Sequence, residues 1–209
     1  MYLSQLILDP RSRRTQAELT HPYEMHRTLM QAFPDELHED ERVLFRVDVD
    51  RRSGVPAVLV QSHGEPNWSF LHDCDNYLLD AGGEDNPAYK AVHLNLREGQ
   101  VLAFRLRANP TVKRNGKRLG LFDEQDQLTW LQRKGESGGF GLISATVRPE
   151  GFEEDRKHAG DQEMKISHYA VRFDGALQVT DPELFIHTVG GGIGPAKAFG
   201  FGLLSVAPA

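Results

Sequence analysis

The segment Gln100-Val101-Leu102-Ala103-Phe104-Arg105-Leu106-Arg107 alternates between apolar and polar side chains, which is typical of a half-buried β-strand. We expect its apolar face to comprise Val101 and Ala103, with Leu106 joining them after a slip in the pattern. Arg105 and Arg107 are expected to point the other way. We expect the secondary-structure elements of the chain to form two successive groups. The second group begins near residue 92, and this strand is its first clear element.

Strand and helix patterns alternate on both sides of this segment. Further strands are expected at residues 2–8, 43–49, 57–61, 140–147, 168–174, 176–180 and 203–206. Helices are expected from a cap at Thr20 to Pro34, and over 68–79, 124–134 and 181–189. Turns are expected at Asn115-Gly116 and Asp174-Gly175, and an exposed loop or hairpin tip over 150–165.

The order of these elements is β-α-β-β-α-β, repeated once, which is the ferredoxin-like pattern. We therefore expect an α+β protein of two tandem ferredoxin-like βαββαβ domains, similar in fold to RNA-recognition motifs. The loop around residues 82–87 predicts a border between a domain over residues 1–88 and another over 89–209. The aromatic signature of an RNA-recognition motif is absent, so the fold alone does not decide the function.

Composition narrows the class of protein. The chain has 209 residues, and its single cysteine, Cys74, excludes an internal disulfide framework and a Cys-based zinc cluster. No apolar run approaches the roughly 20 residues that span a bilayer. Residues 2–8 precede a basic cluster, the reverse of the order in a signal peptide, so we expect a cytoplasmic protein that uses no membrane.

Charge is unevenly distributed along the chain, whose formal net charge is −6. The segment from Arg105 to Arg118 holds basic residues and no acid, whereas acids dominate 34–41. The basic residues are Arg105, Arg107, Lys113, Arg114, Lys117 and Arg118. Because phosphate is bound by local potential, this segment is a candidate nucleic-acid contact despite the acidic total. The alternative is a solvated strand face.

A glycine-rich loop occupies residues 190–202. Glycines such as Gly192 and Gly194 let backbone N–H groups approach an anion, and Lys197 adds a positive charge. The loop follows a predicted helix and lacks the Gly-Lys-Ser/Thr ending of a nucleotide-binding P-loop. It is either a phosphate-binding loop or a tight helix-to-strand connection.

The helix that contains Pro22 carries the best candidates for acid–base chemistry. Tyr23 and His26 are three residues apart, so they share a helix face, and Arg27 can bind phosphate. Histidine exchanges a proton near neutral pH. A histidine at the start of a helix is more often only a surface residue, so this pattern is weak by itself. The other histidines show no metal-ligand spacing, and we expect neither a metal nor another cofactor.

Four blocks and the opening strand together resemble the CasE type of CRISPR repeat-processing endoribonuclease, a family in the repeat-associated RNA-binding superfamily. The blocks are Pro22–Leu29, Phe104–Pro110, Thr129–Lys134 and Gly192–Pro208. The resemblance runs through the whole chain. It implies a metal-independent enzyme that binds the stem-loop of CRISPR repeat RNA and cuts at the 3′ base of the stem. The products would be a 2′,3′-cyclic phosphate and a 5′-hydroxyl, and the enzyme would stay on the guide beside other Cascade subunits.

The resemblance also implies roles for individual residues. His26 holds the position of the catalytic histidine, as general base or general acid, and Tyr23 that of an assisting tyrosine. Gly192, Gly194 and Lys197 correspond to phosphate contacts. The basic segment, with Arg156 and Lys157, would contact the RNA stem, although neighbouring acids put those last two contacts in doubt. A non-catalytic RNA-binding subunit and a protein-interaction module remain the alternative functions.

Overall fold

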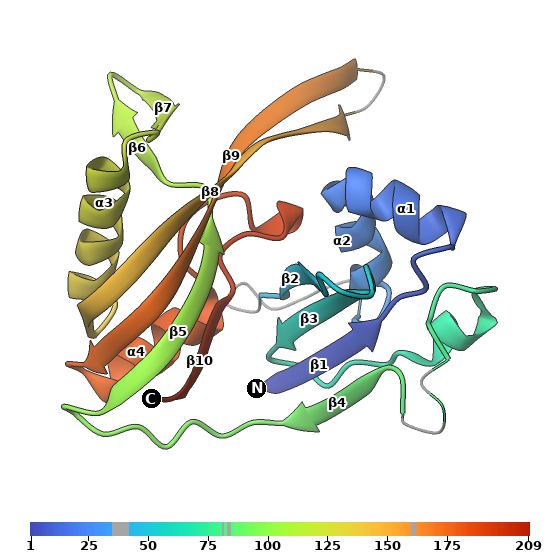
Figure 1. Ribbon diagram of the computed structural model, residues 1–209, viewed down its shortest axis with the longest axis horizontal. Coiled ribbons are helices and arrows are strands. Elements are labelled where there is room, and N and C mark those ends of the chain that lie inside the picture. The colour runs from blue at the N-terminus through green and yellow to red at the C-terminus, as the bar shows by residue number, and fades with distance from the viewer. Residues whose placement is uncertain (35–41, 81, 83–84, 160–161) are drawn as a thin grey trace. The chain divides into compact units, whose positions relative to one another are not determined.

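The computed structural model describes residues 1–34, 42–80, 82, 85–159 and 162–209, without the side chains of 156–165 (Figure 1). The chain forms two compact units, neither of them continuous in sequence. Unit 1 comprises Met1–His93, Asp155–Ile166 and Ala198–Gly200, and unit 2 comprises Leu94–Glu154, Ser167–Lys197 and Phe201–Ala209. No helix in the described residues is long and apolar enough to cross a membrane.

Unit 1 has the ferredoxin-like arrangement that the element order predicts. Its elements are β1 (Tyr2–Ile7), α1 (Arg13–Thr20), α2 (Pro22–Met30), β2 (Leu44–Val49), β3 (Pro56–Ser62), the 3-10 helix η1 (Ser69–Asp73) and β4 (Ala88–Ala91). The sheet has the order β2-β3-β1-β4, and its neighbouring strands pair in antiparallel fashion. Two details differ from the sequence prediction: α1 was not expected, and the segment expected to be helical over 68–79 contains only η1.

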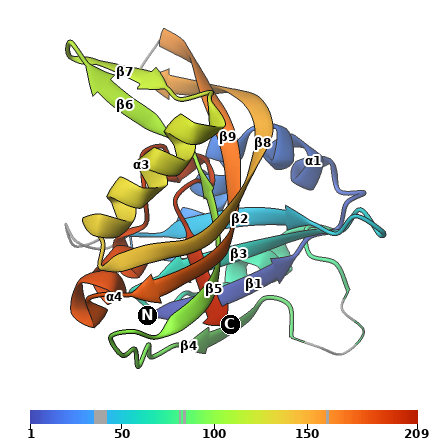
Figure 2. The same ribbon diagram turned by 60° about the vertical axis from the view of Figure 1, so that its left-hand side comes forward.

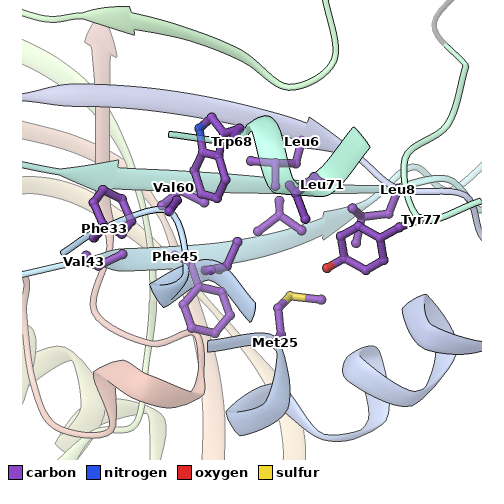
Figure 3. Close-up of a cluster of buried hydrophobic side chains, with 13 residues drawn as sticks. Leu6, Leu8, Met25, Phe33, Val43, Phe45, Val60, Trp68, Leu71 and Tyr77 are labelled. Carbon is purple, nitrogen blue, oxygen red and sulfur yellow. The ribbon is translucent and has the colours of Figure 1, made fainter. Parts of the chain in front are cut away.

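The core of unit 1 lies between the sheet and α2. Leu6 of β1, Phe45 of β2 and Met25 of α2 are fully buried in it, and Figure 3 shows them among the side chains of this cluster. The helix spacing of Met25 and Leu29 turns both toward the sheet, as the sequence predicts. This packing leaves the opposite face of α2 available for other contacts.

Unit 2 repeats the pattern with an added hairpin. Its elements are β5 (Val101–Ala108), β6 (Thr111–Arg114), β7 (Lys117–Gly120), α3 (Glu124–Glu136), β8 (Phe140–Ala159), β9 (Gln162–Val179), α4 (Pro182–Gly191), the 3-10 helix η2 (Lys197–Phe199) and β10 (Leu204–Pro208). The sheet order is β10-β5-β9-β8, with the first strand in the same internal place as β1 in unit 1. The distal parts of β8 and β9, and most of η2, belong to unit 1.

The β6–β7 hairpin confirms the turn predicted at Asn115-Gly116. Both residues have positive φ, 50° and 76°, as a two-residue type I′ turn requires. Figure 2 shows the hairpin projecting from unit 2 beyond one end of α3. Its basic side chains are therefore presented on an exposed arm of the unit.

Several further sequence predictions were wrong. The buried face of β5 consists of Leu102, Phe104 and Leu106 in unbroken alternation, while Val101 is 40% exposed. Arg105 and Arg107 do lie on the opposite face, but Val101 lies there with them. Residues 150–159 continue strand β8, which pairs with β9, so of the two alternatives for 150–165 the loop is wrong. Thr20 ends α1, so His21 and not Thr20 occupies the N-cap of α2.

Asp174-Gly175 is not a turn either, because β9 runs through it without interruption. A Cβ atom at Gly175 would lie 2.0 Å from the backbone oxygen of Ser144. The glycine therefore permits the close approach of the neighbouring strand. Glycine is needed at this position for that backbone packing and not for a turn.

We expect Gly175→Ala to lower the free energy of unfolding by about 1–3 kcal/mol, since the added methyl group forces β8 and β9 apart. Chemical denaturation followed by circular dichroism measures this change. Gly64→Ala is the control, because a Cβ there meets nothing within 4 Å. Equal stability of the two variants would contradict the close packing inferred at Gly175.

Candidate functional site

The start of α2 is fixed by a distant carboxylate. His21 caps the helix without a side-chain hydrogen bond, and Pro22 follows at the first helical position. The backbone N–H of Tyr23 donates to Oδ2 of Asp155 at 2.8 Å. Asp155 is only 3% exposed, and its Oδ1 lies 3.4 Å from Nδ1 of His21. The carboxylate of Asp155 therefore serves as the N-cap acceptor and complements the positive end of the helix.

Tyr23 and His26 are neighbours on α2, and neither belongs to the set of fully buried core residues. Their ring centroids are 6.2 Å apart with the planes tilted by 42°, and both side chains are half-buried. The structure thus brings together the two residues that the sequence pairs by their spacing. The imidazole is half-buried, and its Nδ1 atom has no contact with solvent. Histidine and tyrosine are both residue types that serve in general acid–base catalysis, so the pair is a candidate for that chemistry.

Aromatic packing restrains both rings. His26 stacks on Phe45 of β2, with centroids 6.2 Å apart and an interplanar angle of 11°. Tyr23 stacks on Phe199 at 5.6 Å and 29°. Gly200, with φ of 78°, brings the backbone close to Phe45, where a Cβ would lie 3.2 Å from the ring. Sequence reasoning missed Phe45 and Phe199 because neither is near α2 along the chain.

A buried polar cluster joins α2 to α1. The carboxylate of Glu18, which is 5% exposed, accepts hydrogen bonds from Arg14 Nε at 2.9 Å, Thr28 Oγ1 at 2.7 Å and the Tyr77 hydroxyl at 2.6 Å. Arg14 also donates to Thr28 Oγ1 at 2.9 Å and lies over the Tyr77 ring. Thr28 is two residues beyond His26, so the cluster fixes the helix segment that carries the imidazole.

Burial and the neighbouring negative charge of Glu18 raise the pKa of Tyr77 far above its ordinary value of about 10. The phenol therefore stays protonated and keeps donating to the carboxylate. Burial lowers the pKa of Arg14, but its hydrogen bond and charge interaction with Glu18 outweigh that effect and the net shift is upward. Arg14 and Glu18 at i and i+4 are the only local signal of this cluster in the sequence.

The predicted basic contacts fall into two groups. Arg27 pairs with Glu24 at 3.0 Å, Arg105 with Asp174 at 2.5 Å, and Arg107 with Glu150 and Glu153. Arg107 also packs over Phe201 and is only 14% exposed. The other group lies exposed on the β6–β7 hairpin, without an ion-pair partner among the described residues: Lys113, Arg114, Lys117 and Arg118. Arg156 and Lys157 lie on β8, but their side chains are outside the described set.

The glycine-rich loop is shaped by packing inside unit 2. Gly192 ends α4 with φ of 71°, and Gly194, with φ of 85°, lies where a Cβ would be 3.1 Å from the Trp130 ring. Lys197 follows at the start of η2 and is half-buried. Both glycines thus have a conformational reason for their identity.

Among the described residues, no group of three or more His, Cys, Asp or Glu side chains is arranged to hold a metal ion. The prediction that no metal takes part stays a prediction.

Comparison with known proteins gives full-length matches. A family described as CRISPR associated protein matches residues 1–208. The chain is 41% identical to CRISPR-associated endoribonuclease Cse3 of Thermus thermophilus and 32% identical to Cascade subunit CasE of Escherichia coli K12. Each alignment covers 100% of this chain and 100% of the relative. A solved structure of Cse3 bound to a 19-nucleotide RNA matches with a TM-score of 0.87 at 40% identity, again over 100% of both chains.

We expect Tyr77→Phe to lower the free energy of unfolding by about 1–3 kcal/mol, because it leaves a buried carboxylate with one donor fewer. Urea denaturation at neutral pH measures the change. Tyr89→Phe is the matched control, since Tyr89 donates to Glu65 at the surface. An effect no larger than the control's would contradict the importance of the buried bond.

The pH dependence of stability tests the same group. Because the folded pKa of Tyr77 is raised, its contribution is complete below pH of about 10 and is lost as the pH rises above that value. The stability difference between the wild type and Tyr77→Phe should therefore shrink from pH 9 to pH 11. A difference that stays constant over this range would show that the phenol titrates normally.

Proposed function

The chain belongs to the family of CRISPR-associated proteins and is an endoribonuclease of the CasE type, and we propose that it cuts precursor CRISPR RNA at the 3′ base of the repeat stem. The observation that carries this proposal is the pair formed by His26 and Tyr23 on α2, with ring centroids 6.2 Å apart, in a chain similar over its whole length to a CRISPR-associated endoribonuclease. Two side chains that can each transfer a proton, at this spacing, can both act on a single phosphodiester.

RNA carries its own nucleophile, which shapes the proposed mechanism. The 2′-hydroxyl attacks the adjacent phosphorus, the bond to the 5′-oxygen breaks, and a 2′,3′-cyclic phosphate and a 5′-hydroxyl result. One proton leaves the 2′-oxygen and one joins the departing 5′-oxygen. His26 performs one of these transfers, and Tyr23 orients the phosphate or takes part in the other. The protein must also hold the attacking and leaving oxygens in line.

The remaining residues bind the RNA. The four exposed cations of the β6–β7 hairpin provide a positive arm for the phosphates of a double-stranded stem, which is read mainly by shape and backbone. Arg27 lies one residue from His26 and contributes to the phosphate near the cut. Gly192, Gly194 and Lys197 form a second phosphate contact, and Arg105, Arg107, Arg156 and Lys157 complete the proposed set. After cleavage the protein stays on the hairpin as a subunit of Cascade.

Substitution of the imidazole tests the mechanism. We expect His26→Ala to reduce the single-turnover cleavage rate by about 10²–10⁴, because proton transfer is lost, while hairpin affinity changes little. His63→Ala is the control, an exposed histidine elsewhere in unit 1. Cleavage by His26→Ala at the wild-type rate would remove His26 from the mechanism, and would leave the chain's activity to another group.

Two further conditions separate this chemistry from a metal-dependent one. A 2′-deoxy nucleotide immediately upstream of the cut should block cleavage, since the nucleophile is then missing. EDTA should leave the rate unchanged. If the deoxy substrate is cut or if EDTA stops the reaction, water activated by a metal ion becomes the better explanation.

The role of the hairpin is tested by salt dependence. We expect Arg114→Ala with Lys117→Ala to weaken RNA binding and to reduce the slope of log affinity against log salt by about 2, one for each lost phosphate contact. Arg51→Ala with Arg52→Ala removes two exposed cations from unit 1 and serves as the control. A slope equal to that of the wild type would place the RNA elsewhere.

A further inference from the structure

Unit 2 contains a pocket to which the proposed function assigns no role. Arg118 is the one residue of its lining that is already among the proposed RNA contacts. Its volume is about 290 Å³, at the small end of the range for small-molecule sites. The pocket opens beside the β6–β7 hairpin, and its walls are formed by β7, β8, β9 and the glycine-rich loop. The main lining residues are Asn109, Arg118, Phe122, Phe152, His168 and Tyr169.

Three aromatic rings gather at the pocket. The Phe122 and Tyr169 centroids are 4.9 Å apart, those of Phe152 and Tyr169 are 5.1 Å apart, and those of Phe122 and Phe152 are 5.7 Å apart. Phe122 and Phe152 are nonetheless 58% and 65% exposed. A cluster of large aromatic side chains that are held together and left open to solvent indicates a binding surface more than a core.

The ring of Phe122 is fixed against the basic hairpin. A Cβ at Gly120 would lie 3.1 Å from its Cζ atom, so the glycine at the end of β7 lets the ring fold back onto the strand. Arg118, two residues earlier on the same strand, is exposed and has no ion-pair partner among the described residues. An aromatic ring and a cation thus both line the pocket.

The floor of the pocket is polar. Nδ2 of Asn109 and Nδ1 of His168 are 3.0 Å apart and hydrogen-bonded, and Asn109 is 7% exposed. The lining contains an amide, an imidazole and hydroxyl groups, but no carboxylate. Aromatic walls, a hydrogen-bonding floor and a neighbouring cation match the base, the base edge and the phosphate of one nucleotide.

We propose that this pocket receives one unpaired base of the repeat RNA, which stacks on Phe122 and Phe152 while Arg118 contacts its phosphate. The proposal rests on the proposed function, because it assigns a further contact to the same RNA. The absence of acids from the lining and the adjoining basic hairpin favour a polyanion over a protein partner. The base is specified only as unpaired, because a base inside the stem has no exposed face to stack.

The experiment measures binding of a repeat RNA that carries the 2′-deoxy block, so that cleavage does not interfere. We expect Phe122→Ala with Phe152→Ala to weaken binding about tenfold, as loss of stacking on aromatic rings typically does. Tyr89→Ala, which removes an exposed ring from unit 1, should leave affinity unchanged. Phe152→Trp should retain it, since a tryptophan offers a larger stacking face.

Abasic nucleotides identify the stacked base. Placed in turn at each unpaired position, they should weaken wild-type binding at one position and cause no further loss there in the double variant. In the wild type, 2-aminopurine at that position should lose fluorescence on binding, which requires no variant to fold. Loss of affinity in the double variant that is equal for intact and abasic RNA at every position would overturn the proposal.

Other outcomes have distinct meanings. If the double variant binds RNA like the wild type but loses association with another Cascade subunit, the pocket is a protein-docking surface and the proposal is wrong. If the wild type itself does not bind the repeat hairpin, both this proposal and the proposed function fail. If the wild type binds and the double variant binds equally well, only the pocket assignment fails, because His26 is not involved.

Discussion

The position of α2 depends on one buried carboxylate. Glu18 is taken out of water and would strongly destabilise the fold without partners, but it accepts hydrogen bonds from Arg14, Thr28 and Tyr77, which come from three separate segments. A charge in that setting tolerates few alternative arrangements, since each displaced donor leaves the carboxylate under-coordinated. The cluster therefore fixes α1, α2 and the chain after η1 relative to one another within unit 1.

The fixed position of α2 also restrains the side chains of Tyr23 and His26. Asp155 holds the first turn of α2, Glu18 holds its middle through Thr28, and Phe45 and Phe199 restrain the His26 and Tyr23 rings. In the proposed mechanism, an imidazole that is already oriented loses little conformational freedom when RNA binds, so binding energy can serve to align the 2′-hydroxyl with the phosphate. The cations of the β6–β7 hairpin belong to unit 2, so the proposed RNA contacts and the proposed proton transfer on α2 are assigned to different units of the chain.

The sequence correctly predicted features that depend only on residues close together in the chain. Asn115-Gly116 forms its turn because both residues accept positive φ, and Tyr23 and His26 share a face because of helix periodicity. Contacts between residues distant in sequence could not be predicted. Tyr77 is 59 residues from Glu18. The prediction of a turn at Asp174-Gly175 was wrong because the sequence near it does not show that the backbone of Ser144 packs against Gly175. On β5 both alternating faces contain apolar side chains, and the larger ones, Leu102, Phe104 and Leu106, face the core.

The most direct measurement is the mass of the 5′ fragment released from repeat RNA by the wild-type protein in EDTA. If the RNA supplies the nucleophile and α2 supplies the proton transfer, the fragment ends in a 2′,3′-cyclic phosphate and is lighter by one water molecule than a fragment with a linear phosphate. A fragment that ends in a 3′-hydroxyl would contradict this mechanism, because an external water would then have attacked the phosphorus and the 3′-oxygen would have departed.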